Sequence, residues 1–265
     1  GDAQGFLMDN IEFGLAFISD QQDTSRQWTA LSATATSVGF VGFLDFLPSI
    51  RNLTVELNQA SQDGDKVIDF QADTLDVATG TGTAITLDMD GSAGELLRAE
   101  GDITLKLFNF AYFSGRLGFE KYTPADPLTL RKENGSTTTA EATSVLAITG
   151  QNIKAFVGYA ENGFDDTKTL AQQADTLYGF GVEGVNFAVM MIDAGGQSYT
   201  AVKLSMENVR LFGIDTSIFE LSAEGVNFIY NGKDDAGTVV DFAASFGGGL
   251  TLGSQGNIVL DMSTY

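Results

Sequence analysis

The chain carries a long internal repeat. Three segments recur in the same order at nearly constant spacing: 11–18 with 185–192, 67–72 with 239–244, and 85–89 with 258–262. The offsets are 174, 172 and 173 residues, so the 265 residues hold about one and a half copies of one unit. Repeats at a fixed period are typical of arrays in which similar units stabilise their neighbours. We therefore expect a first unit at 1–177 and a partial second unit at 178–265, cut from a longer array.

Alternation of apolar and polar residues predicts β-strands. It is clear at Asp102–Leu107, Leu53–Asn58 and Asn152–Phe156, each of which places its apolar residues on one face. The chain is also rich in Phe and Gly (20 and 31 residues) and poor in Pro (3 residues), which favours β structure. We expect an all-β fold, an elongated repeat of antiparallel strands stacked as a meander or sandwich in a solenoid-like array. Only one short helix is expected, at 166–178.

A shorter motif recurs inside the long unit. It is a polar residue, then Asn or Gly, then a branched apolar residue, and it begins at Asp9, Arg51, Glu183, Glu207 and Glu224. Asn and Gly adopt a positive φ more readily than other residues. We interpret the motif as a turn that precedes each new strand.

Polar loops between alternating runs predict hairpins. The expected pairs are 226–230 with 238–242, 53–57 with 66–70, and 188–192 with 199–204. Two stretches break the pattern: a loop-rich insertion at 124–144, around the short run Leu128–Leu130, and an acidic linker at 160–176 that precedes the second copy.

Charge and composition exclude several classes of function. The formal net charge of −21 is opposed to nucleic-acid binding, which needs Lys and Arg to neutralise phosphates, and it repels anionic membranes. The chain has no Cys and no His, which excludes a typical zinc site, a Cys nucleophile and a His general base. No apolar run is long enough for a membrane-spanning helix. Asp69/Asp241 and Asp88/Asp261 recur with the repeat, but a catalytic pair would not be needed in every copy, so we expect no enzymatic activity.

Two acidic segments contain candidate calcium ligands. They are Asn162, Asp165, Asp166 and Asp175 in the linker, and Asn231, Asp234 and Asp235 in a Gly-containing loop. Calcium binds six to eight oxygens, which short loops rich in Asp and Asn supply. The same residues are common in solvated turns, and neither segment has the spacing of an EF-hand. Both interpretations stay open.

The strand motifs resemble the tandem repeats of very large exported bacterial surface proteins. The similarity rests on Gly184–Met191, Tyr199–Leu204, Glu100–Leu105 and Gly118–Lys121, and it extends over nearly the whole chain. The resemblance implies a location outside the cell or on the bacterial cell surface, and it brings no catalytic residues.

These observations predict a structural repeat of an extracellular fibre, a surface layer or an adhesin stalk. Its expected partners are neighbouring copies of the same repeat, with surface glycans as a further candidate. Two alternatives stay open. One is an outer-membrane β-barrel, which the alternation, aromatic content and acidity also suit. The other is a carbohydrate-binding or carbohydrate-active β-domain, to which the aromatic residues at 108–119 could contribute.

Overall fold

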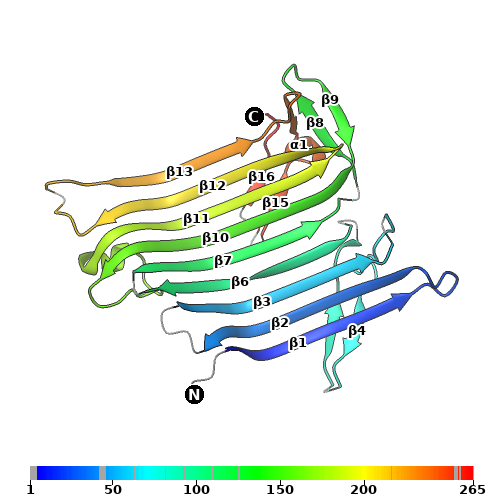
Figure 1. Cartoon of the computed structure of the whole chain (residues 1–265), viewed down its shortest axis with the longest axis horizontal. Helices are drawn as coiled ribbons and strands as arrows, with labels where there is room; N and C mark the ends of the chain where they lie inside the picture. Colours follow the sequence, from blue (N-terminus) through cyan, green and yellow to red (C-terminus); the bar gives the residue numbers. More distant parts are fainter. Residues whose placement is uncertain are drawn as a thin grey trace.

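The strands of the chain form one large sheet. The computed structural model describes residues 5–41, 46–62, 64–80, 82–91, 94–108, 110–124, 126–215, 217–253, 256 and 258–264. Nine strands pair in the order β1 (Gly5–Ser19), β2 (Gln27–Val41), β3 (Phe46–Ala60), β6 (Leu96–Leu107), β7 (Ala111–Tyr122), β10 (Ala142–Ala160), β11 (Leu177–Ala194), β12 (Gln197–Phe212) and β13 (Ser222–Asn231). Every neighbouring pair is antiparallel. Within the described residues, β1 and β13 are the two edges of this sheet (Figure 1). The expected all-β antiparallel fold is confirmed.

Three excursions leave the sheet and cover part of one face. The first contains β4 (Leu75–Ala78) and β5 (Ala84–Leu87), and the second contains β8 (Leu128–Lys132) and β9 (Thr137–Ala140). The third contains β14 (Thr238–Val240), α1 (Phe242–Ser245), β15 (Leu250–Leu252) and β16 (Ile258–Leu260). β14 pairs with β8, which joins the second and third excursions. In Figure 1, β4, β15 and β16 lie behind the large sheet. We call this side of the sheet the covered face and the opposite side the uncovered face.

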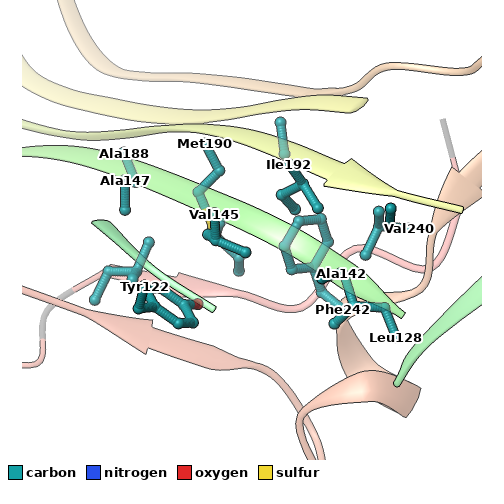
Figure 2. Packing of buried hydrophobic residues seen from close by; sticks show 14 of the residues in the cluster. Tyr122, Leu128, Ala142, Val145, Ala147, Ala188, Met190, Ile192, Val240 and Phe242 are labelled. Atoms are coloured by element: carbon teal, nitrogen blue, oxygen red, sulfur yellow. The ribbon is translucent and has the colours of Figure 1, made fainter. Parts of the chain in front are cut away.

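The main core lies between the sheet and its covers. Alternate residues of a strand project to the same face. On the covered face these are Val145 and Ala147 of β10 and Met190 and Ile192 of β11, which are almost fully buried. They pack in one cluster with Phe242, the fully buried first residue of α1 (Figure 2).

A second, smaller core lies under the acidic linker. Phe164 of the linker stacks on Tyr112 of β7 and Phe156 of β10, with ring centroids 4.6 and 5.5 Å apart. The helix expected at 166–178 is reduced to a 3-10 helix, η2 (Ala171–Thr176), and β11 begins at the next residue. The predicted unit boundary at 177/178 therefore lies at the start of β11, which pairs with β10 along most of its length.

The sequence repeat is also a repeat of contacts. β1, β2 and β3 correspond to β11, β12 and β13, and each trio is followed by a cover. The Asn58 side chain donates to the Ile68 carbonyl (2.8 Å), as the Asn231 side chain does to Val240 (2.9 Å). In both copies a buried Phe at the start of the cover donates its backbone N–H to the carbonyl of a Met, in the pairs Phe70–Met89 and Phe242–Met262. Each copy thus begins with a trio of strands and a tethered cover.

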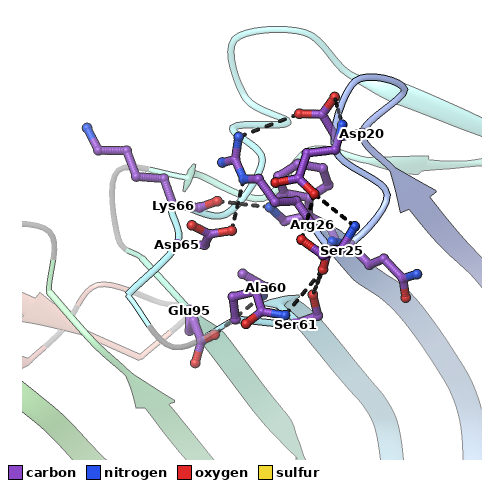
Figure 3. A network of polar contacts seen from close by, with 12 residues as sticks. Asp20, Ser25, Arg26, Ala60, Ser61, Asp65, Lys66 and Glu95 are labelled. Carbon is purple, nitrogen blue, oxygen red and sulfur yellow. Dashed lines mark hydrogen bonds and ion pairs between the residues drawn. The ribbon is translucent and has the colours of Figure 1, made fainter.

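The loop between β1 and β2 holds the first cover in place (Figure 3). The Arg26 guanidinium pairs with Asp65 (3.0 Å) and with Asp20 (3.5 Å). The Trp28 indole donates to the Lys66 carbonyl at 2.9 Å. The sequence 19–27 is longer than its counterpart in the second copy, and it contains both Asp20 and Arg26.

One predicted hairpin is confirmed and two are wrong. Residues 188–192 pair with 199–204 as β11 and β12. Residues 226–230 do not pair with 238–242, because β13 pairs with β12 whereas β14 pairs with β8. Likewise β3 pairs with β2 and β6, and 66–70 form no strand. In both copies the chain leaves the sheet after the third strand to bury apolar residues over its face.

The recurring Asn/Gly motif lies in the middle of strands. A positive φ is confirmed at Asn10, Asn52, Gly184 and Gly225, and Asn152 of β10 shares it. Asn208 does not have it. The interpretation as strand-entry turns is wrong, because these residues interrupt the pairing ladders inside β1, β3, β10, β11 and β13. At Asn52 and Asn152 the register of the pairing also shifts, and bulges of this kind bend a strand and increase its twist.

Candidate functional site

Charged side chains form rows across the covered face. One row of directly paired residues contains Glu56 of β3, Arg98 of β6 and Glu120 of β7. Arg98 bridges the two carboxylates, at 2.9 Å from Glu56 and 3.1 Å from Glu120. Burial alone would lower the pKa of Arg98, but the hydrogen bonds and negative charges of Glu120 and Glu56 raise it above its ordinary value.

A second ladder lies farther along the same strands. Arg116 of β7 bonds Glu100 at 2.8 Å and Asp102 at 3.1 Å, and Asn52 donates to Asp102 at 2.7 Å. The hydrogen bond that Arg116 donates to Glu100 is the largest cause that raises the pKa of Arg116. Asn52 is also the positive-φ residue of β3, so the bulge brings its side chain onto the ladder.

A cavity of about 520 Å³ lies between the first ladder and the third cover. Glu56, Arg98 and Glu120 line its floor, and residues 245–246 and 250–253 form its roof. Tyr122 also lines the cavity, with a buried hydroxyl that has no hydrogen-bond partner among the described residues, and burial raises its pKa. Because Arg98 holds both carboxylates in ion pairs, the cavity offers fixed charges and the unpaired hydroxyl of Tyr122. Sequence reasoning missed this site, since the ladder depends on the register of three strands.

The first set of candidate calcium ligands is dispersed in the structure. Asp165 accepts hydrogen bonds from the amide and hydroxyl of Thr167, which lower its pKa, and it pairs with Lys168 at 3.3 Å. The Asp166 carbonyl accepts from the Lys154 ammonium at 2.9 Å. Asn162 and Asp175 are exposed.

The second set serves mainly to hold a cover. The Asn231 amide donates to the carbonyls of Val240 and Thr264. Asp234 accepts from the amides of Ala236 and Thr238 and from the Tyr199 hydroxyl. Asp235 is exposed. Across the part of the chain that the structure describes, no group of three or more acidic, His or Cys side chains is placed to hold a metal ion.

Asp234→Asn should make the chain less sensitive to acid. Burial raises the pKa of Asp234, but hydrogen bonds from Thr238, Tyr199 and Ala236 together lower it below its ordinary value. A lowered folded-state pKa stabilises the fold above the ordinary pKa, and this contribution disappears as pH falls through the folded-state pKa. We expect Asp234→Asn to lower the urea midpoint at pH 6 and to lower it less near pH 2.5. An equal difference at both pH values would contradict this assignment.

Comparison with protein-family models, with curated proteins and with solved structures found no match in any of the three. No helix in the described ranges is both long enough and apolar enough to cross a membrane. The geometry of the repeat is therefore the basis for a functional assignment.

Proposed function

We propose that this chain is a structural repeat of an extracellular fibre, surface layer or adhesin stalk, in which successive units add strands to one continuous antiparallel sheet. The observation that carries the proposal is that both edge strands are copies of interior strands. A free strand edge presents unpaired N–H and C=O groups, which pair readily with another strand.

The free edge of β13 corresponds to the edge of β3 that pairs with β6. β13 aligns with residues 49–58 of β3 at an offset of 173 residues, so that Gly225 matches Asn52, Phe228 matches Val55 and Asn231 matches Asn58. Gly225 and Asn52 share a positive φ, and both Asn side chains hold a cover. A strand like β6 is therefore the expected neighbour of β13 in the next unit.

The edge of β1 supports the same proposal. β1 is the copy of β11, which pairs with β10 on one side and β12 on the other. A strand like β10 would thus precede β1. Each unit of this array contributes six strands, which widen the sheet by about 29 Å at a spacing of about 4.8 Å. Absence of Cys, an acidic surface and the resemblance to exported repeats are consistent with an extracellular setting.

Cross-linking in an extended chain tests strand addition. Residue 265 corresponds to residue 92, so residues 93–265 appended after residue 265 continue the array with its own sequence. In this fusion we introduce Phe228→Cys and, in the appended copy, Ala99→Cys. Val55, the equivalent of Phe228, pairs directly with Ala99. We expect an intramolecular disulfide to form in most molecules under mild oxidation, because the chain has no other Cys.

The matched control moves the second cysteine along the same strand. Ile103→Cys in the appended copy lies four residues from Ala99, about 13 Å along a strand, which is beyond the reach of a disulfide. Equal cross-linking of both variants, or of neither, would contradict addition in the β3–β6 register.

A further inference from the structure

The uncovered face of the sheet is apolar from one edge to the other. One row of directly paired residues crosses all nine strands: Phe13, Ala33, Val55, Ala99, Phe119, Ile148, Val189, Val202 and Tyr230. Several of its large side chains are well exposed, with Phe13 at 59% and Tyr230 at 49%. The neighbouring row on the covered face contains the ion pairs of Glu56, Arg98 and Glu120 instead.

Among the residues that the structure describes, charged side chains are absent from a broad band of this face. Lys121 and Asp193 lie at one limit of the band, and Tyr159 and Tyr178 lie at the other. The described residues that project from the face between these limits are all uncharged. The charged side chains of the described residues therefore lie mostly on the covered face, the covers and the loops. Two copies could meet through this face without bringing charges together.

The uncovered face has ridges and grooves. Large residues on β1 and β7, such as Phe13 and Phe119, alternate with small residues on β2 and β6, such as Ala33 and Ala99. Sheets that pack face to face interdigitate their side chains, and alternation of large and small residues allows this. A face in contact with lipid does not need alternating large and small side chains, because fluid hydrocarbon adapts to any surface shape. In hydrocarbon the free backbone groups of β1 and β13 would also be left without partners.

The area of the face fits a stable interface. Nine strands at about 4.8 Å spacing and about 11 residues at 3.3 Å give about 1,500 Å² per copy. Two copies would bury about 3,000 Å² in total, well above the roughly 1,600 Å² of ordinary interfaces and within the range of obligate homodimers. Monomeric proteins rarely expose an apolar patch larger than a few hundred Å².

We infer that the uncovered face binds the uncovered face of a second copy of this chain, which produces a two-layer sandwich with the covered faces outside. The contact uses side chains of one face, whereas strand addition uses backbone groups of the edges. The pairing of faces therefore does not depend on the proposed array. Combined with strand addition, it would give a fibre or layer two sheets thick.

Sedimentation velocity between 1 and 100 µM tests the inference. We expect the unsubstituted chain to sediment as a dimer, and Phe119→Glu at the centre of the face to raise the dissociation constant at least 100-fold. A matched pair on the edge strand β13 keeps the test valid if that variant fails to fold. Phe228 (52% exposed) lies on the uncovered face, and Ile229 (57% exposed) lies beside it on the covered face opposite Lys203. Phe228→Glu should weaken the dimer at least tenfold, and Ile229→Glu less than twofold.

Two results would overturn the inference. One is equal weakening by Phe228→Glu and Ile229→Glu, which would place the contact elsewhere. The other is a chain that stays monomeric at 100 µM but binds vesicles of neutral phosphatidylcholine, with binding abolished by Phe228→Glu and unchanged by Ile229→Glu. That result would assign the face to lipid.

Discussion

Phe242→Ala should destabilise the chain by about 3–5 kcal/mol, the usual cost of truncating a fully buried Phe. The Phe242 side chain is completely buried between α1 and the sheet and stacks on Phe246. Its removal leaves a cavity in the main core, to which Met190 and Ile192 also belong. Urea unfolding followed by circular dichroism measures the loss.

The equivalent change in the first copy, Phe70→Ala, should cost a similar amount. Phe70 is 2% exposed, belongs to the same core and makes the same backbone contact with a Met carbonyl. Trp28, the single Trp of the chain, bonds the first cover and reports on it by fluorescence. Truncation of a buried Phe usually lowers the free energy of unfolding by more than about 1 kcal/mol. A smaller loss for Phe70→Ala, together with a loss of about 3–5 kcal/mol for Phe242→Ala, would show that the two covers are not equivalent.

Gly158→Ala should separate the ends of β10 and β11 and destabilise the chain by about 3 kcal/mol or more. Gly158 faces Gly179 across the two strands, and both have a φ near +150°. A Cβ on Gly158 would lie 2.2 Å from the Tyr178 carbonyl oxygen and 2.7 Å from the Gly179 Cα. Backbone atoms cannot move aside as a flexible side chain can, so the strands must part.

Hydrogen exchange locates this effect. Amides of 153–160 and 177–182 should exchange faster in Gly158→Ala, together with the linker that packs on Phe156. Gly196→Ala in the β11–β12 turn is the control, since it also has a positive φ but nothing lies within 4 Å of its Cβ. We expect it to cost about 1 kcal/mol. Equal costs for the two variants would argue against close strand contact at Gly158.

Most of the large sheet could be predicted from the sequence, because alternation reports directly on strands with two different faces. Residues 102–107, 53–58 and 152–156 all lie in strands. The repeat also aligns Asn231 with Asn58. This match predicts that the two side chains have the same role, and in the structure each of them holds a cover. Asp69 and Asp241, which recur without marking a catalytic pair, each accept a backbone N–H from the residue three positions later.

The arrangement of the covers could not be predicted. A polar loop between two apolar runs favours a hairpin, but β3 and β13 are held by other strands of the sheet. Thr238–Val240 instead pairs with residues more than 100 positions earlier. Local sequence carries little information about such distant partners. The ladder of Glu56, Arg98 and Glu120 was missed for the same reason, since it depends on the register of three strands.

The role of the candidate calcium residues could not be predicted from the sequence for a different reason. Asp and Asn in short loops suit both cation binding and Asx turns, because both use the same oxygen atoms. In the structure Asp165 and Asp234 accept hydrogen bonds from nearby backbone amides. Their residue types alone could not distinguish these roles.

Hydrogen exchange of β13 tests most directly whether successive units widen one sheet. In the chain of 265 residues, the amides of Ser222–Asn231 that face away from β12 have no strand partner among the described residues and should exchange fast. In the fusion that appends residues 93–265, the same amides should become protected at least 100-fold, because the appended β6 pairs with them. Proline at positions 99 and 103 of the appended copy removes two strand amides and should abolish the protection. Unchanged fast exchange of β13 in a folded fusion would contradict the account and mean that units form separate sheets.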